Sequence, residues 1–338
     1  MRIVIIGASG NLGTALLRRA AREPDTELVG VSRRRPGHAE PYASATWHTI
    51  DIGSPSAPAR LRVALHGADA VVHLGWALQP NHREPVMART NVGGTRAVLD
   101  AAAAVGVPHV LVASSVGAYS FGPKHSRVSE DWPTGGLQTS HYSRHKAINE
   151  RAMDVFEEEN PETVLTRLRP GLVFQPDAAR EIAHLFAGRH IPVQLLGLIR
   201  HLPVLPLPTS LISQAVHSDD VAEAFWLAIS RRAGGAFNIA AEPVLGPSEI
   251  AAALGVPCTV PFRRGVLRAI VALSWRLRLQ ASDPGWIDIA TSVPVMSTDR
   301  ARRELGWEPT ISSTEALRAI ADAFAVNRGL PGSPSLGG

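Results

Sequence analysis

The sequence predicts an α/β fold in which a parallel sheet carries helices on both of its faces. The first half of the 338-residue chain alternates short apolar runs with longer helical stretches, the order of strands joined by crossover helices. The first run, residues 3–6, is followed at once by a turn that contains Gly7, Gly10 and Gly13. The alternation stops after Pro170, and this change predicts a smaller, mostly helical C-terminal lobe.

Seven short runs of four or five residues, most of them apolar, have the length and composition of buried strands. They cover residues 3–6, 28–31, 47–50, 70–74, 110–113, 164–168 and 237–240. Helices are expected at residues 12–22, 59–65, 86–105, 140–159, 221–230, 299–306 and 314–324, with further helical segments within 245–292.

The glycine-rich turn predicts a dinucleotide site. Glycines permit a positive φ and let a ligand approach the backbone, and the following helix offers free N–H groups and the positive end of its dipole to a pyrophosphate. A second apolar run follows at the distance of a βαβ unit, so the fold is expected to be of the Rossmann type. The expected contacts of this turn with the cofactor are Gly7, Ser9, Gly10, Asn11, Leu12 and Gly13.

The sequence after the second strand favours NADP over NAD. A site that prefers NAD usually has a carboxylate there, which accepts a hydrogen bond from the ribose 2'-hydroxyl, whereas arginines suit a 2'-phosphate. This chain has Arg33 and Arg34 at that point and no acidic residue. After the third strand, Asp51 and Ile52 are expected to border the adenine.

The domain organisation follows from the same alternation. Residues 1–174 are expected to form the nucleotide-binding domain, to which residues 209–243 and 293–312 return. Residues 175–208 and 244–292 are expected to form the substrate-binding lobe. Residues 329–338 are rich in glycine, serine and proline and are expected to be a flexible tail.

Composition narrows the classes of partner. The 34 basic and 30 acidic side chains leave a net charge of +4 without a basic block, which gives no reason to expect a nucleic-acid partner. The single cysteine, Cys258, excludes an internal disulfide and a cysteine-based metal cluster, and we expect no metal site. Because no leader segment precedes the first strand, we expect a cytoplasmic protein.

No apolar run reaches the roughly 18 to 20 residues that span a bilayer, so we expect no stable membrane insertion. The nearest candidate is the basic amphipathic stretch at residues 265–279. Such a helix can lie on a membrane surface, but it more often covers a substrate pocket or a core, and that is the expectation here.

A serine, a tyrosine and a lysine form the candidate catalytic group. Ser115 ends a predicted strand, while Tyr142 and Lys146 lie four residues apart and therefore project from one face of a predicted helix. An ammonium beside a phenol is expected to lower the phenol's pKa, so that it can exchange a proton with a carbonyl or alcohol oxygen. The serine hydroxyl would hold the same oxygen.

These motifs resemble the extended short-chain dehydrogenase/reductases, the NAD(P)-dependent epimerase/dehydratase family. Besides the glycine turn and the Tyr-x-x-x-Lys pair, the resemblance covers further segments in order along nearly the whole chain. They are His73-Leu74-Gly75-Trp76, Asn91-Val92-Gly93-Gly94-Thr95, Arg169-Pro170-Gly171-Leu172-Val173-Phe174, Val216-His217-Ser218-Asp219-Asp220-Val221-Ala222 and Glu304-Leu305-Gly306-Trp307-Glu308-Pro309. Phe174 departs from the family's usual tyrosine.

The resemblance implies a role for each matched residue. Tyr142 would be the acid/base, Lys146 would bind the nicotinamide ribose and lower the pKa of Tyr142, and Ser115 would polarise the substrate oxygen. Further cofactor contacts would come from Leu74, Gly75, Trp76, Asn91, Pro170 and Val173. His217 and Asp220 would be structural, with Asp220 capping its helix. The family's dimers imply a homodimer through helices 86–105 and 140–159, whose alanines, such as Ala97, Ala101 and Ala104, allow close approach.

The family leaves three functions open. The first is an NADP-dependent oxidoreductase that transfers a hydride between the nicotinamide and a ketone or secondary alcohol, and it is favoured because residues 205–214 offer no cation for a nucleotide-sugar diphosphate. The second is a nucleotide-sugar 4-epimerase that retains its NAD(P), and the third is a non-catalytic NADP-binding sensor. Sugar dehydration is disfavoured, because residues 122–126 lack the Thr-Asp-Glu-like set that such dehydratases carry. The expected substrate walls are Trp76, Ser115, Val116, Phe174, Leu195 and Leu196, with Trp275 and Trp286 as further candidates.

Overall fold

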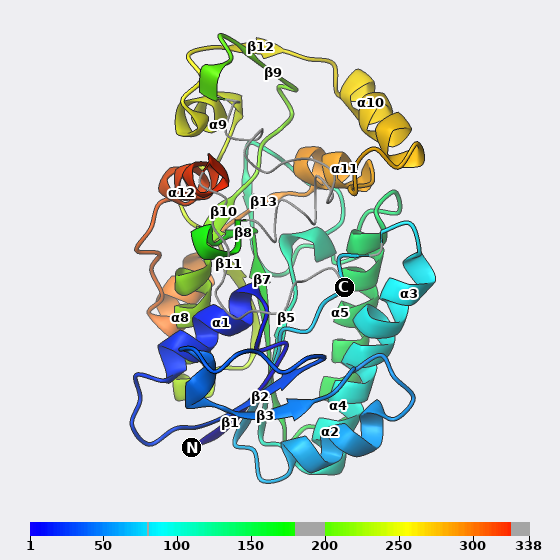
Figure 1. Cartoon of the computed structure of the whole chain (residues 1–338), viewed down its shortest axis with the longest axis vertical. Coiled ribbons are helices and arrows are strands. Elements are labelled where there is room, and N and C mark those ends of the chain that lie inside the picture. The colour runs from blue at the N-terminus through cyan, green and yellow to red at the C-terminus, as the bar shows by residue number, and fades with distance from the viewer. Residues whose placement is uncertain (80, 180–199, 326–338) are drawn as a thin grey trace.

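The computed structural model describes residues 1–79, 81–179 and 200–325 (Figure 1). Its centre is a seven-stranded, wholly parallel sheet in the order β11-β7-β5-β4-β1-β2-β3. The strands are β1 Arg2–Ile6, β2 Glu27–Ser32, β3 Thr46–Thr49, β4 Ala70–His73, β5 His109–Ala113, β7 Val164–Pro170 and β11 Gly235–Ile239. This order confirms the doubly wound α/β fold that the alternation predicts.

Helices cover both faces of the sheet because the central strands are apolar on both sides. Ile3, Val4, Ile5 and Ile6 are all buried, as expected of a strand with no solvated face. One face packs against α1 Asn11–Ala20 and α8 Ser218–Arg231. The other face packs against α2 Ala57–Leu65, α4 Gly94–Ala104 and α5 His141–Glu159 (Figure 1).

The helix predicted over residues 86–105 is interrupted by a wide π-type turn. The chain runs from α3 Glu84–Ala88 through the turn Arg89–Gly93 into α4. The carbonyl of Asn91 accepts hydrogen bonds from two side chains, Thr95 Oγ1 at 2.7 Å and Asn149 Nδ2 at 2.8 Å. Such turns are found mostly at functional sites, and this one presents Asn91 to the loop after β4.

Beyond the carboxyl edge of the sheet lies a smaller lobe built mostly of helices (Figure 1). Its helices are α9 Pro247–Leu254, α10 Arg264–Arg276 and α11 Gly285–Ser292, and α12 Ser313–Ala325 packs beside α9. Three parallel pairs of short strands lie outside the main sheet: β6 Arg127–Val128 with β13 Val295–Met296 and β8 Leu172–Phe174 with β10 Ala215–His217 between lobe and sheet, and β9 Leu205–Leu207 with β12 Thr259–Pro261 within the lobe (Figure 1). Strands of two or three residues show no periodicity, which is why the sequence does not predict them.

The remaining short elements are helical turns. They are η1 Tyr42–Ser44, η3 Val116–Ala118 and η4 Pro176–Ala178, together with a π-type turn at Ala301–Leu305 where a helix is predicted over residues 299–306. No helix among the described residues is long and apolar enough to cross a bilayer. The predicted domain boundaries stay predictions, and the predicted tail at residues 329–338 lies outside the described residues.

The cap of α8 differs from the expectation. His217 is the N-cap residue, and its Nδ1 accepts the N–H of Asp219 at 3.2 Å. Asp220 instead accepts hydrogen bonds from Thr310 N at 2.9 Å, Thr310 Oγ1 at 2.7 Å and Ile311 N at 3.2 Å. The prediction that Asp220 caps its helix was wrong, because the chain segment that follows Trp307 folds back across the start of α8.

Candidate active site

The glycine turn brings the end of β1, the start of α1 and the loop after β4 into close contact. Gly7 has φ +86°, and a Cβ there would lie 2.7 Å from the backbone nitrogen of Gly75. A Cβ at Gly13 would lie 2.3 Å from the carbonyl oxygen of Gly7. Both positions require glycine because a side chain would collide with the neighbouring backbone. Gly7 requires it also because its backbone is left-handed.

The first turn of α1 is left open toward this loop. Its N-cap residue is Gly10, which has no side chain to satisfy the free N–H groups of the turn. Asn11 carries a buried Oδ1 that has no hydrogen-bond partner among the described residues. An open helix N-terminus beside an unpaired buried polar atom is suited to bind the pyrophosphate of a dinucleotide.

A cavity of about 590 Å³ extends from this turn across the carboxyl ends of the strands. The predicted residues that line it are Gly7, Gly10, Asn11, Leu12, Gly13, Arg33, Leu74, Trp76, Ser115, Val116, Tyr142, Lys146, Pro170, Val173 and Phe174. The glycine turn, the Ser-Tyr-Lys group and the apolar walls thus share one continuous space, although they come from segments as far apart as residues 7 and 174.

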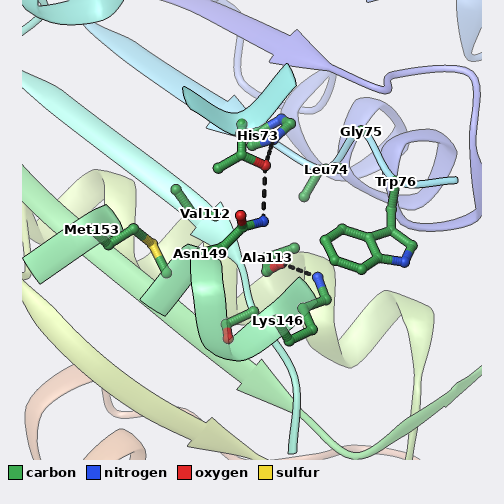
Figure 2. Close-up of a pocket in the computed structure, with 11 residues that line it drawn as sticks. His73, Leu74, Gly75, Trp76, Val112, Ala113, Lys146, Asn149 and Met153 are labelled. Carbon is green, nitrogen blue, oxygen red and sulfur yellow. Dashed lines mark hydrogen bonds between the residues drawn. The ribbon is translucent and has the colours of Figure 1, made fainter. Parts of the chain in front are cut away.

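Six predicted cofactor contacts do not line this cavity: Ser9, Arg34, Asp51, Ile52, Gly75 and Asn91. Asp51 accepts the N–H of Gly53 at 3.0 Å and so closes its own turn, while Ile52 is buried against the helix at Gly94. Gly75 lines a smaller hollow beside Lys146 (Figure 2). The predicted wall residues Leu195 and Leu196 lie outside the described residues.

Asn91 holds the loop after β4 from behind. Its Oδ1 accepts the N–H of Ala77 at 2.7 Å, and its Nδ2 donates to the carbonyl of Ala77 at 2.9 Å. His73, the last residue of β4, is buried, and its Nε2 lies 2.9 Å from Thr95 Oγ1 (Figure 2). Burial lowers the pKa of His73 to about 3. Both side chains therefore position the loop that carries Trp76.

Ser115 and Tyr142 meet across the N-terminus of η3. Ser115 Oγ accepts the N–H of Gly117 at 3.0 Å, and it also acts on the phenol of Tyr142, whose pKa it lowers against the effect of burial. A Cβ at Gly117 would lie 2.8 Å from Cε1 of Tyr142, so glycine is needed for the ring to reach the serine. The ring of Tyr142 lies between Trp76 and Trp286, with centroids 5.4 Å and 4.8 Å away.

Lys146 faces Trp76 more closely than it faces Tyr142. Its Nζ donates to the carbonyl of Ala113 at 2.7 Å and lies 3.7 Å from the ring centroid of Trp76, against 5.8 Å for Tyr142 (Figure 2). A cation over an indole face is stabilised by the ring's quadrupole. Trp76 thus occupies the side of the ammonium that faces the cavity.

The pKa values differ from the expectation of an activated phenolate. Burial raises the pKa of Tyr142 to about 12, with the Ser115 hydrogen bond acting in the opposite direction. Burial also lowers the pKa of Lys146 to about 7, although the charge of Glu150 acts to raise it. In this structure a half-protonated lysine turned toward Trp76 cannot pull the phenol's pKa down, so at neutral pH Tyr142 carries its proton.

A buried ion pair fixes the helix that carries Tyr142 and Lys146. Glu150 is fully buried and accepts hydrogen bonds from Arg169 Nε at 2.9 Å and Arg169 Nη2 at 2.8 Å. Glu150 also accepts a hydrogen bond from the hydroxyl of Ser114, the residue before Ser115. Burial alone would raise the pKa of Glu150, but the hydrogen bonds and charge of Arg169 hold it below its usual value.

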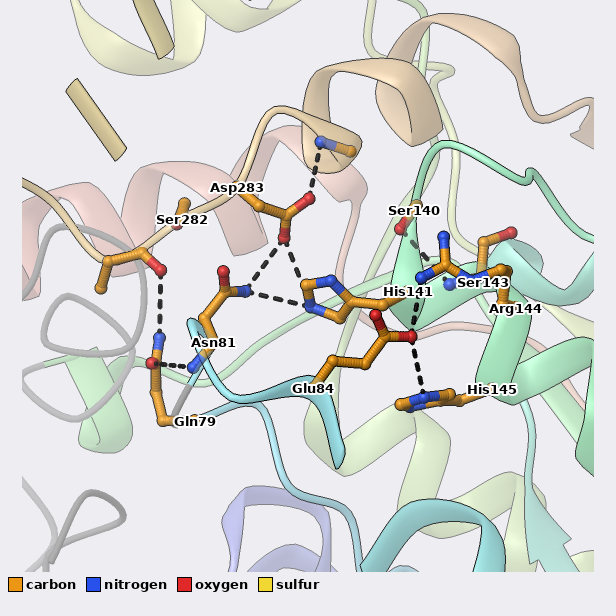
Figure 3. Close-up of polar contacts among 12 residues, drawn as sticks. Gln79, Asn81, Glu84, Ser140, His141, Ser143, Arg144, His145, Ser282 and Asp283 are labelled. Carbon is orange, nitrogen blue, oxygen red and sulfur yellow. Dashed lines mark hydrogen bonds and ion pairs between the residues drawn. The ribbon is translucent and has the colours of Figure 1, made fainter. Parts of the chain in front are cut away.

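Hydrogen bonds and an ion pair connect the lobe to the sheet domain (Figure 3). Asn81 Nδ2 lies 2.9 Å from Asp283 Oδ2 and 3.1 Å from His141 Nε2, which itself is 3.4 Å from Asp283. On the same side, Arg144 donates to Glu84 at 2.7 Å. The loop after β4, the start of α5 and the segment before α11 therefore meet at one buried polar cluster.

The sequence did not predict the wall formed by α12 and part of α11. Leu317, Ile320 and Phe324 line the cavity from α12, and Ile289 does so from α11 next to the predicted Trp286. The spacing of apolar residues in α12 predicted a helix, but it did not predict that the apolar face of this helix would line the cavity. Trp275, by contrast, does not line the cavity and stacks on His82 with the ring centroids 4.5 Å apart.

The comparisons with known proteins agree with this architecture. The profile of the NAD dependent epimerase/dehydratase family matches residues 3–240. The chain belongs to this family. Membership makes it an enzyme of the extended short-chain dehydrogenase/reductase class, which works with a nicotinamide cofactor.

Individual relatives of the family are distant in sequence. The uncharacterized protein YbjS of Escherichia coli K12 is 23% identical over 95% of this chain and 97% of its own length. MoeE5, solved with UDP-glucuronic acid and NAD, has a TM-score of 0.69 at 21% identity over 97% of this chain and 100% of its own. The UDP-glucose 4-epimerase of Thermotoga maritima, solved with UDP-glucose, has a TM-score of 0.69 at 19% identity over 97% of this chain and 99% of its own. At these identities the two solved structures show a shared fold.

A nicotinamide dinucleotide fits the residues of this site. The open first turn of α1 and the unpaired Oδ1 of Asn11 lie at one end of the cavity, and Lys146 and Tyr142 lie further along it. The buried Nε1 of Trp76, whose ring packs on Lys146 and Tyr142, also has no partner among the described residues. Polar atoms without partners are therefore found along the path that an extended dinucleotide would follow.

The low pKa of Lys146 predicts a pH-dependent difference in stability for Lys146→Met. The unfolded chain keeps the lysine proton up to about pH 10.4, whereas the folded protein releases it near pH 7. Wild-type stability therefore rises with pH across this window. Methionine has a similar volume and no charge, so the variant's melting temperature should exceed the wild type's most at pH 6, with the difference shrinking by pH 9.

Thermal unfolding followed by circular dichroism at pH 6, 7.5 and 9 measures this difference. Arg62→Met on the exposed side of α2 is the control, and its difference from wild type should not change with pH. A Lys146→Met difference that is equally constant would contradict the lowered pKa.

Proposed function

We propose that the protein is an NADP-dependent oxidoreductase that interconverts an apolar ketone and its secondary alcohol. The observation that carries this proposal is the chemistry of the cavity beyond the Ser-Tyr-Lys group. The walls there are apolar: Leu78, Val116, Phe174, Trp286, Ile289, Leu317, Ile320 and Phe324. Among the described lining residues only Arg33 and Lys146 are charged, and neither belongs to this part of the cavity.

A nucleotide-sugar diphosphate would need cationic partners, and the described residues at this end of the cavity do not offer them. Of the candidate arginines in the described part of the lobe, Arg264 is paired with Asp288 at 3.0 Å, and Arg200 and Arg263 are exposed outside the cavity; Arg189 lies outside the described residues. Lys124 donates to the carbonyls of Ile212 and Ala290 instead. Placing a diphosphate against apolar walls would leave its charges unpaired, at a cost of several kcal/mol.

The proton-transfer roles follow from the geometry of the three residues. The bound nicotinamide would supply the hydride or accept it. Ser115, oriented by the N–H of Gly117, would hold the substrate oxygen beside the phenol of Tyr142. Because Tyr142 is protonated at neutral pH, it is suited to donate a proton to that oxygen as a ketone is reduced. Lys146, one turn further along α5, would bind the nicotinamide ribose once Trp76 moves aside.

Turnover of a panel of substrates tests the proposed reaction. We expect ketones of increasing apolar size to oxidise NADPH, with KM falling as the apolar group grows, and UDP-sugars to cause no net change in absorbance. Tyr142→Phe should lower kcat by about 10²- to 10⁴-fold while NADPH still binds. Tyr42→Phe, which removes a hydroxyl outside the cavity, should keep the wild-type kcat.

The same assay distinguishes the second candidate, a nucleotide-sugar 4-epimerase that retains NAD(P). The fold shared with MoeE5 and the Thermotoga maritima epimerase over nearly the full length of each chain favours this candidate. Conversion of a UDP-sugar to its epimer without consumption of NADPH would overturn the oxidoreductase proposal. NADPH binding with no turnover of either class, unchanged in Tyr142→Phe, would instead favour the NADP-binding sensor.

The preference for NADP rests on Arg33. It is exposed at the end of β2 and lines the cavity, while the carbonyl of Val31 on the same strand accepts the N–H of Gly7 at 2.8 Å. We expect Arg33→Ala to weaken NADPH binding about tenfold or more through the loss of a charge-assisted bond to the 2'-phosphate. NADH binding should change little, and Arg35→Ala, exposed outside the cavity, is the matched control. Equal weakening of NADPH and NADH would contradict a role at the 2'-phosphate.

We also propose a homodimer formed through α4 and α5. Ile148 and Val155 lie two turns apart on α5 and are 37% and 51% exposed, which leaves an apolar strip on the outside of the molecule. Light scattering should give twice the 36.0 kDa mass of the chain, and the double variant Ile148→Asp/Val155→Asp should give a single chain. A wild-type monomer, or a dimer that survives this double variant, would contradict the proposed interface.

A further inference from the structure

Helix α10 turns an apolar strip toward solvent. Val266, Ile270, Leu273 and Leu277 follow one another at intervals of four, three and four residues, and therefore lie on one side of the helix. Each is between 46% and 61% exposed, and no residue of α10 is buried. Isolated apolar side chains on a surface need no explanation, but a continuous strip of four marks an interaction surface.

The opposite side of α10 is held by ion pairs to α11 and by Trp275, which stacks on His82. Arg264 Nη2 and Arg268 Nε both lie 3.0 Å from Asp288 Oδ1 on α11. The same helix α11 presents Trp286 and Ile289 to the cavity. The inner side of α10 thus combines these ion pairs with the stacking of Trp275, while the four exposed apolar side chains occupy the outer side, where a surface helix usually carries polar residues. The sequence-based expectation that this helix covers a pocket or core accounts only for its inner side.

The charge around the strip has one sign. Between Glu249 and Asp283 the chain has no acidic residue and five arginines, namely Arg263, Arg264, Arg268, Arg276 and Arg278. Arg263, Arg276 and Arg278 are exposed at the two ends of α10, and none takes part in an ion pair between described residues. The strip is thus an apolar surface flanked by unpaired positive charge.

We propose that α10 docks this protein on the surface of an anionic lipid bilayer. The apolar strip would enter the boundary between headgroups and acyl chains, while the flanking arginines would contact anionic headgroups. A helix of 13 residues is too short to cross a bilayer and therefore lies in its surface. A second copy of the chain fits this face less well, because it would oppose Arg263, Arg276 and Arg278 of one copy with the same three arginines of the other, and none of them has an ion-pair partner among the described residues.

Binding to vesicles tests the docking directly and does not depend on catalysis. The full-length protein is sedimented with vesicles of phosphatidylglycerol and phosphatidylcholine at 1:1, and with vesicles of phosphatidylcholine alone. We expect binding to the anionic vesicles, weaker binding to the neutral ones, and a loss of that difference at high salt. Ile270→Asp/Leu273→Asp should lower binding to anionic vesicles at least about tenfold, because it places charge where the apolar strip enters the bilayer.

Two further variants separate the contributions and control for nonspecific effects. Arg276→Glu/Arg278→Glu should weaken binding to anionic vesicles and leave binding to neutral ones unchanged. Val63→Asp alters an equally exposed apolar side chain on α2, at the far end of the molecule in Figure 1, and should bind as the wild type does. All of these side chains are exposed, so the variants should keep the wild-type melting temperature.

Three results would overturn the proposal. They are a wild-type protein that does not sediment with anionic vesicles, an Ile270→Asp/Leu273→Asp variant that binds as well as the wild type, and a wild-type dimer that this variant converts to a monomer without any vesicle binding. The last result would make the face an interface between two copies of the chain. None of these results bears on the reaction, since failure of the oxidoreductase proposal would appear only in the turnover assay.

Discussion

The site depends on the buried ion pair between Glu150 and Arg169. Arg169 lies next to the last residue of β7, and Glu150 lies one helical turn after Lys146 on α5, so the pair fixes the helix against the sheet. Ser114 joins the pair from the end of β5. Three elements that would otherwise be free to slide are thereby fixed at the point where Ser115, Tyr142 and Lys146 meet.

Such a pair is better understood as a positioning device than as a source of stability. Removing two charges from water costs several kcal/mol for each ion, and their attraction recovers this only when the remaining hydrogen bonds are satisfied. Here they are satisfied, because Arg169 also donates to Tyr119 Oη at 3.0 Å and to the carbonyl of Glu130 at 2.7 Å. Loss of any one of these hydrogen bonds would leave a buried charge without a partner, and this cost favours a single arrangement of Glu150 and Arg169.

Lys146 is the complementary case of a charge that burial destabilises. Its ammonium has one carbonyl and one indole face as close partners, and burial lowers its pKa to about 7. A lysine in this state is suited to exchange the Trp76 face for ribose hydroxyls, since both its stem and its charge already lie at the cavity wall. The unfavourable burial of the Lys146 ammonium lowers the stability of the folded protein, and this ammonium is the group that the cofactor would contact. Perturbed pKa values are common at functional sites.

The sequence by itself determined the parallel sheet, the glycine turn and the membership of Ser115, Tyr142 and Lys146 in one site. These depend on local patterns, namely apolar runs, glycine spacing and a four-residue helical interval, which a single segment carries within itself. The short strand pairs, the wall from Leu317 and Ile320 and the role of Asp220 depend instead on contacts between segments tens to hundreds of residues apart. Only the tertiary structure decided them, together with the orientation of Lys146 toward Trp76 and the outward turn of the α10 strip, because an apolar pattern specifies that a face will be covered but not by what.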